Sequence, residues 1–277
     1  LRRAKGLYLF LSFVLVLSMF AGVGISSGRA DAAVPIVIDG LKDPYWEQVE
    51  VLGNSPSPGW EGFHIGELRM TSDDAYLYYY VSAVNVPNWG DNGMFIDIAL
   101  NVNGQDSGAD GNPWAAQFNY SGMPFKPQIH ITQRVKQDNE VNGAAVYKDG
   151  NQLLATWDDP KGAEFAVVRT SGFEGKIPLD VLGLQEGDIV YPHVTISGNN
   201  SAEHGAFDTI PEAPGNALAQ SWQVSPPNVQ SVYANPFVVG SGEDRLTVVG
   251  VSPSNGAAGV PVGLDRITVT VNDDIAL

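Results

Sequence analysis

"AYLYYYVSAV", residues 75–84, alternates aliphatic and aromatic side chains with a period of two. Successive side chains of a β-strand point to opposite faces of a sheet, so this alternation predicts a strand. One predicted face carries Leu77, Tyr79, Val81 and Ala83, and the other carries Tyr76, Tyr78 and Tyr80. Because neither face is strongly polar, we expect both faces of this strand to be at least partly covered.

Short runs of the same kind recur along the chain, separated by turns rich in Gly, Asn, Asp and Pro. Many short strands at this spacing predict an all-β fold, an antiparallel β-sandwich of the jelly-roll kind. "PLDVLGL", residues 178–184, is the one clear helical turn, with Pro178 at its start and Gly183 at its end. The absence of a long amphipathic pattern argues against a parallel α/β enzyme core. The further runs are residues 63–70, 93–101, 115–120, 128–135, 143–148, 164–170, 173–178, 188–196 and 229–239.

The first 32 residues have the three-part pattern of a secretory signal. Basic residues near the start precede an apolar run over residues 7–25, and small residues follow in "GRADAA". We expect cleavage after Ala32 and a secreted, extracellular protein. A retained membrane anchor is the alternative, because the apolar run approaches the length that spans a bilayer.

The net charge and the cysteine count exclude several classes of partner and fold. The chain carries a net charge of −16, and residues 1–32 carry a net +3, so the mature chain would carry −19. Such an acidic protein is unsuited to nucleic acid and is not attracted to an anionic membrane. With no cysteine in the chain, the exported fold cannot depend on disulfides and needs a large hydrophobic core.

A domain boundary is predicted near "GSGEDR", residues 240–245, where Gly, Ser and charged residues interrupt the strand pattern. The segment beyond it resembles the opening of a bacterial Ig-like domain, in the turn of residues 252–261 and the strand "ITVTV" of residues 267–271. Two or three strands are too few to close a sandwich, so we expect a truncated Ig-like segment. The predicted parts are therefore residues 1–32, 33–240 and 241–277.

Catalytic constellations are poorly supported by the sequence. None of its histidines, His64, His130, His193 and His204, lies beside a Gly-x-Ser-x-Gly nucleophile elbow. Paired carboxylates for glycoside cleavage meet only in three dimensions, so spacing does not identify them. No catalysis is expected from this fragment.

The loop "NVNGQDSGADGN", residues 101–112, gathers side chains whose oxygens suit calcium. Asn103, Asp106 and Asp110 are the candidate ligands. The loop lacks EF-hand spacing and its terminal Glu, and an ordinary solvated loop is the alternative.

Six tryptophans are the strongest remaining functional signal. The apolar face of a sugar ring stacks on an indole, while nearby Asn, Gln and Asp side chains bond its hydroxyls. Trp89 and Trp114 flank an apolar strand in loops rich in turn residues, and Trp222 lies in a Pro-rich connection. We select these three as candidate carbohydrate-binding residues. Trp46 is expected to be a core anchor, and Trp60 and Trp157 lie beside turns.

Several motifs in order resemble DOMON-like modules related to family 9 carbohydrate-binding modules, including the C-terminal domain of glucodextranase and modules of amylopullulanases. The opening "IVIDGLKDPYWEQ" is followed by "NWGDNGMFIDIALN", "DGNPW", "GKIPLDVLGL" and "HGAFDTIPEAPGNALAQSW". The resemblance covers residues 36–240. It implies a β-sandwich attached to an extracellular amylolytic enzyme, and Trp89, Trp114 and Trp222 match its recurrent tryptophans. His204 and Asp208 match its His-x-x-Asp-Thr stretch, where a buried carboxylate is expected to hold a loop through backbone amides.

The sequence thus supports two hypotheses. In the first, the chain is a non-catalytic module that binds starch-like α-glucan for a secreted pullulanase-like glycoside hydrolase. In the second, it is a structural spacer or a cell-wall or S-layer attachment element without affinity for sugar.

Overall fold

The computed structural model describes residues 35–87, 93–135, 141–198, 204–212, 227–240, 248–252 and 268–271. Internal contacts divide the chain into Leu1–Ala32 and Ala33–Leu277, and every described residue belongs to the second unit. No helix among these residues is both long and apolar enough to cross a lipid bilayer.

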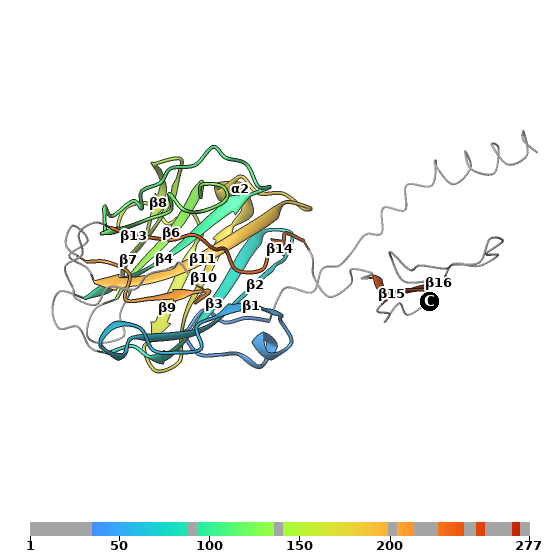
Figure 1. The fold of residues 1–277 in the computed structure, drawn as a ribbon, viewed down its shortest axis with the longest axis horizontal. Helices are drawn as coiled ribbons and strands as arrows, with labels where there is room; N and C mark the ends of the chain where they lie inside the picture. The colour runs from blue at the N-terminus through green and yellow to red at the C-terminus, as the bar shows by residue number, and fades with distance from the viewer. Residues whose placement is uncertain are drawn as a thin grey trace, which may run out of the picture. The chain divides into compact units, whose positions relative to one another are not determined.

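Two large antiparallel sheets hold most of the described strands, which confirms the predicted all-β sandwich (Figure 1). In spatial order, sheet A consists of β1 (Val51–Asn54), β2 (His64–Ser72), β3 (Tyr76–Asn85), β10 (Gly172–Pro178) and β9 (Glu164–Val168). Sheet B consists of β12 (Asp208–Ile210), β11 (Ile189–Gly198), β4 (Met94–Val102), β6 (Ile129–Val135), β7 (Val141–Lys148) and β8 (Asn151–Ala155), and β14 (Phe237–Val238) also pairs with β11.

The core lies between the two sheets and follows the predicted alternation. Leu77, Tyr79 and Val81 of β3 are fully buried in the main apolar cluster, together with inward residues of β4, β6 and β11. Tyr78 and Tyr80 point to the other side of sheet A and are also buried. The prediction that both faces of residues 75–84 are covered is therefore confirmed.

The N-terminal segment covers the outer face of sheet A. Its short 3-10 helix, Pro44–Glu47, buries Trp46 completely against Tyr80, with ring centroids 5.8 Å apart. The indole N–H of Trp46 donates to Glu174 Oε1 at 2.8 Å, and the Gly40 N–H donates to Glu174 Oε2 at 2.8 Å. Trp46 is thus the core anchor that the sequence predicts.

The outer face of sheet B is covered by two long segments. The segment between β4 and β6 contains β5 (Phe118–Asn119), which pairs in parallel with β13 (Asn228–Val229). Phe118 and Tyr120 pack on Phe95 and Ala99 of β4 in a second apolar cluster. Polar side chains of β4, β6 and β11 are buried beneath this cover.

Two strand predictions are wrong in extent. Residues 115–120 form a strand only at Phe118–Asn119, and residues 229–239 do not form one strand. The second segment instead crosses the sandwich, because its backbone bonds are divided between partners: Ala234 N–H donates to Pro192 O, and Asn235 N–H donates to Leu52 O. The strands β1, β8 and β12 lie outside the predicted runs.

The predicted helical turn is confirmed as α2 (Leu179–Leu182). It follows Pro178 and ends at Gly183, whose φ of 65° is the left-handed conformation that favours glycine. A second 3-10 turn, besides Pro44–Glu47, lies at Trp60–Gly62.

Farther along the chain, β15 (Val248–Ser252) and β16 (Thr268–Val271) pair antiparallel. This pairing does not identify an Ig-like domain. The boundaries 1–32, 33–240 and 241–277 remain predictions.

Candidate functional site

The candidate site lies on the outer face of sheet B, at the row that contains Arg134. Arg134 of β6 is directly opposite Phe95 of β4 and Gly143 of β7. Directly opposed residues of neighbouring strands project to the same face. Phe95, Arg134 and the open position above Gly143 therefore lie side by side on the outer face.

Trp114 lies at one end of this row. Its ring centroid is 6.0 Å from that of Phe95, and the guanidinium carbon of Arg134 lies 5.4 Å from the indole centroid. Asn112 fixes the turn, because its Oδ1 accepts from the Trp114 and Ala116 N–H groups at 3.0 Å. The half-buried Trp114 thus holds Arg134 in a cation–π contact.

Trp157 lies at the other end of the row and is 55% exposed. A Cβ atom at Gly143 would lie 2.8 Å from Cε3 of Trp157 and 3.0 Å from Cζ3, so only glycine leaves room for the ring. Thr156 joins the backbone directly before Trp157 to β7. Its N–H donates to Ala144 O at 2.9 Å, and its Oγ1 accepts from the Ala144 N–H at 2.9 Å. The indole is therefore seated directly on the sheet.

We call Trp114, Arg134 and Trp157, with Gly143 beneath, the outer platform. Arg134 makes no ion pair with any acid that the structure describes. An exposed indole next to a guanidinium that pairs with none of the described acids can contact the apolar face of a ring and also donate hydrogen bonds to hydroxyl oxygens.

A buried polar cluster supports the loop that carries Trp114. Tyr120 O–H donates to Asp97 Oδ2 at 2.7 Å, and His130 Nδ1 lies 3.1 Å from the same oxygen. Burial, reinforced by the charge of Asp97, raises the pKa of Tyr120 well above its usual value. The Tyr120 hydroxyl therefore stays protonated and keeps donating to Asp97.

His193 borders this cluster in its neutral form. Burial is the main cause that lowers the pKa of His193 to about 4. Its Nδ1–H donates to Val232 O at 3.0 Å, which leaves Nε2 as a buried acceptor with no partner among the described residues. Gln230 lies close enough to raise the His193 pKa slightly, yet the two side chains make no well-formed hydrogen bond.

Of the three tryptophans selected from the sequence, only Trp114 falls within the described residues. Trp89 and Trp222 lie outside them. Trp60 packs at the sandwich edge, with its ring centroid 4.6 Å from that of Phe207. Sequence reasoning did not select Trp157 or Arg134, although Trp157 directly precedes the turn "DDP". The pairing of Arg134 with Gly143, which brings the platform together, has no local sequence signal.

The candidate calcium ligands are bonded to protein groups. Asn103 Oδ1 accepts from the Ile189 N–H at 2.8 Å, and Asp106 Oδ1 accepts from the Lys126 N–H at 3.3 Å. Asp110 forms an ion pair with Lys126 Nζ at 2.9 Å. Among the described residues, no three His, Asp or Glu side chains form a group that could hold a metal. Calcium binding remains a prediction.

Asp208 has the structural role that the sequence predicts. Its buried carboxylate accepts from the Ile65 N–H, the Thr209 N–H and the Ser55 hydroxyl, each at 2.8 Å. Asp208 thereby joins β12 of sheet B to β2 and its preceding loop in sheet A.

No protein-family model matches this chain, and no curated protein matches its sequence. Two solved structures of a family 9 carbohydrate-binding module from Caldicellulosiruptor kristjanssonii are similar to it, one in complex with cellotriose and one with glucose. Each is 15% identical and covers 76% of this chain. The matches cover 91% and 94% of those chains, with TM-scores of 0.39 and 0.37. Likeness at this level carries no argument about the ligand of this chain.

Proposed function

We propose that the sandwich is a non-catalytic carbohydrate-binding module whose outer platform contacts the ligand. One observation carries the proposal: the Trp157 residue is more than half exposed, yet its ring lies directly over Gly143 of the sheet. A large aromatic ring held at the surface is the group that sugar rings stack against.

The platform divides the contact between two chemistries. The Trp157 indole packs against the C–H face of a sugar ring, and Arg134 donates hydrogen bonds to its hydroxyl or ring oxygens. Trp114 contributes by holding Arg134 and displays less of its own ring, because it also packs on Phe95. A shallow surface buries little of each sugar, so the affinity is weak.

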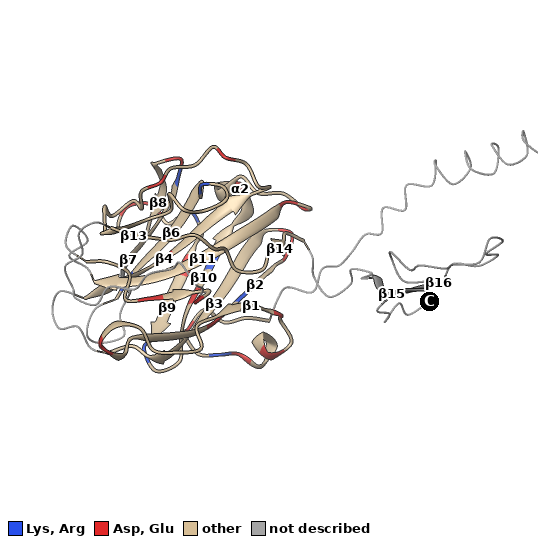
Figure 2. Ribbon diagram, viewed as in Figure 1, with Lys and Arg blue, Asp and Glu red and all other residues tan. Residues whose placement is uncertain are grey.

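Charge favours a neutral polysaccharide. The chain carries a net charge of −16, from 31 Asp and Glu against 15 Lys and Arg. Figure 2 marks where the described ones lie along the ribbon. An anionic polymer would be repelled at long range despite Arg134.

The finer proposal names the ligand and the parent protein. The ordered motifs of residues 36–240 support a starch-like α-glucan as the ligand and a secreted, pullulanase-like glycoside hydrolase as the whole protein. Trp89 and Trp222 are then further contacts, and attachment to the cell wall or S-layer is the alternative role.

Affinity electrophoresis in gels that contain amylopectin or a soluble β-glucan tests the proposal. We expect amylopectin to retard the protein. The variant Trp157→Ala should bind amylopectin with about tenfold lower affinity, because it loses a stacked aromatic ring. Leu41→Ala is the control, because Leu41 is 51% exposed but belongs to the segment on sheet A.

Equal retardation of Trp157→Ala and wild type would remove the platform from the binding site. Retardation by the β-glucan alone would overturn α-glucan as the ligand. Absence of binding across a glycan array, with retained association to cell walls, would select the attachment role instead.

A further inference from the structure

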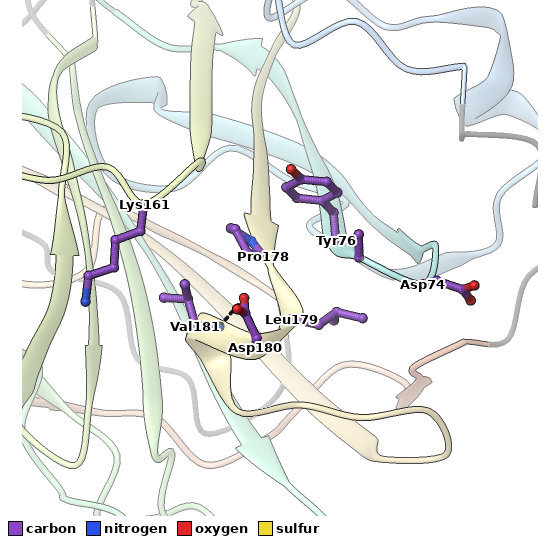
Figure 3. Close-up of a pocket in the computed structure, with 8 residues that line it drawn as sticks. Asp74, Tyr76, Lys161, Pro178, Leu179, Asp180 and Val181 are labelled. Atoms are coloured by element: carbon purple, nitrogen blue, oxygen red, sulfur yellow. Dashed lines mark hydrogen bonds between the residues drawn. The ribbon is translucent and has the colours of Figure 1, made fainter.

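A separate cleft of about 600 Å³ is lined in part by Lys161, which belongs to the same β8–β9 loop as Trp157. It lies between the β2–β3 turn, the start of α2 and the β8–β9 loop (Figure 3). Tyr76, Pro178 and Leu179 give it an apolar and aromatic lining, and Asp74, Lys161 and Asp180 give it charged groups. This volume is in the range of sites that hold small organic ligands.

The wall formed by the β2–β3 turn is fixed by hydrogen bonds. Asp73 Oδ1 accepts from the Ala75 N–H at 2.9 Å and from the Tyr76 N–H at 2.7 Å. The other oxygen of Asp73 accepts from the Tyr78 hydroxyl at 2.7 Å. The turn therefore holds its shape without a ligand.

The wall formed by α2 is joined to that turn. The Leu179 N–H donates to Ala75 O at 2.8 Å, and Lys148 Nζ donates to Leu182 O at 2.9 Å. A cleft with both walls fixed loses little conformational entropy when a ligand enters.

Tyr76 is held in place from the side of sheet A. Lys176 Nζ lies 4.9 Å from the Tyr76 ring centroid and pairs with Glu164 Oε1 at 2.7 Å. This contact orients the half-buried ring, which also lines the cleft.

The charged groups of the cleft keep spare bonding capacity. Asp180 Oδ1 accepts from the Val181 N–H at 2.8 Å, and neither Asp74 nor Lys161 makes a side-chain bond among the described residues. In the view of Figure 3, Lys161 and Asp74 lie at opposite ends of the lining residues, and their charged groups point outward from them. The cleft therefore offers the Asp180 carboxylate beside Pro178 and Leu179, with the Lys161 ammonium and the Asp74 carboxylate within reach only at its two ends.

This mixture of groups suits the neutral carbohydrate of the proposed function better than an apolar or a charged ligand. An apolar ligand would desolvate the Asp180 carboxylate, whose Oδ2 has no bond partner among the described residues. An anion would face Asp74 and Asp180, and a cation would face Lys161. A neutral molecule with many hydroxyl groups can donate to the carboxylates and accept from the ammonium, while its C–H face lies on Tyr76 and Leu179.

We propose that this cleft is a second binding site, for a short neutral saccharide or the end of a glucan chain. The inference takes its ligand class, but not its location, from the proposed function. Because Trp157 and Lys161 belong to one short loop, the two sites would act on one polysaccharide. Two weak contacts on one polymer strengthen binding through effective concentration.

Two-dimensional NMR of the full chain, titrated with maltotriose and in parallel with cellotriose, tests this site. We expect at least one of the two sugars to shift the Ala75, Leu179 and Val181 amides as one group and the Trp157 indole N–H as another. In the double variant Lys161→Met/Asp180→Asn, the affinity measured from the first group of signals should fall about fivefold or more. The affinity measured from the Trp157 signal should stay unchanged. Lys42→Met is the matched control, because Lys42 pairs with Glu47 in the N-terminal segment.

The outcomes separate the two proposals. Shifts confined to the Trp157 group, with both sugars, would overturn the cleft and keep the platform. Shifts of the cleft amides that persist in Trp157→Ala would support the cleft independently, even if the platform fails. If the cleft amides gave the same affinity in the double variant and in wild type, the cleft proposal would be overturned. The absence of shifts at both groups with both sugars would also overturn it. Thermal unfolding of each variant shows whether it is folded.

Discussion

The indole of Trp157 lies over Gly143, close enough that a methyl group at that glycine would come within 2.8 Å of the ring. The exposed aromatic surface of the outer platform therefore depends on a residue of β7 that has no side chain. This relationship allows the platform to be altered without changing Trp157 itself.

Gly143→Ala should displace the Trp157 ring and weaken glucan binding. The ring is exposed and can rotate away from the added methyl group, so the contact itself costs little stability. The free energy of unfolding should fall by only about 1 kcal/mol, because residue 143 has a positive φ that disfavours alanine. Gly150→Ala is the matched control, because Gly150 has a φ of 79° and no atom within 4 Å of an added Cβ. Tryptophan fluorescence and affinity electrophoresis measure the effect. Unchanged binding in Gly143→Ala would show that the seated position of the indole is unimportant.

Tyr120→Phe should destabilise the fold by about 1–3 kcal/mol, because it leaves the buried carboxylate of Asp97 without its 2.7 Å donor. Since Tyr120 belongs to the segment that carries Trp114, binding should weaken as well. Urea denaturation gives the stability, and Tyr80→Phe serves for comparison because the Tyr80 hydroxyl donates only to Ser171 O. A loss of stability no larger than that of Tyr80→Phe would contradict the role of the buried cluster.

Glu174 should make stability fall as pH rises. Burial is the main cause that raises its pKa from 4.5 to about 7, while bonds from Trp46 and Gly40 act in the opposite direction. A folded-state pKa above the unfolded one means that the folded protein binds the proton more tightly. The stabilising contribution is therefore complete below pH 4.5 and lost as pH rises through 7.

Glu174→Gln isolates this effect, because other titrating groups remain the same in both proteins. The free energy of unfolding of wild type, minus that of the variant, should decrease between about pH 4.5 and 7. Denaturant titrations across this interval measure the difference. A difference that is constant with pH would mean that Glu174 has the same pKa in both states.

Asp208→Ala should cost about 2–4 kcal/mol of stability, because the Ile65 and Thr209 amides and the Ser55 hydroxyl lose a shared buried acceptor. Glucan binding by the fraction that remains folded should be unchanged. Calorimetric titration below the unfolding temperature can separate these effects. A selective loss of binding would instead give Asp208 a role in the site.

Local patterns predicted those parts of the fold that depend on local chemistry. The alternation in residues 75–84 predicted a strand covered on both faces, and Pro178 and Gly183 predicted the limits of α2. The same reasoning treated residues 229–239 as a strand, since apolar residues recur there. Their backbone partners, Pro192 and Leu52, are distant in sequence and belong to different sheets.

The candidate site was harder to predict, because it depends on strand register. The ladder between β6 and β7 keeps one register from Ile129 to Arg134 and thereby places Arg134 opposite Gly143. No pattern in the sequence shows this register. Trp114 was identified as a loop tryptophan, but its contact with Arg134 could not be. Trp89 and Trp222 stay predictions, since they lie outside the described residues.

The crossing segment that ends at Gly240 also determines how the sandwich would respond to mechanical tension. The Gly240 N–H donates to Ser72 Oγ at 2.7 Å, the Val239 N–H donates to Asp188 O at 2.9 Å, and two residue pairs join β14 to β11. A pull on the chain after residue 240 would break these few bonds in succession before it reached the main sheets. The strand β14 would then separate from β11 at low force, while the other strands of the two main sheets stayed packed.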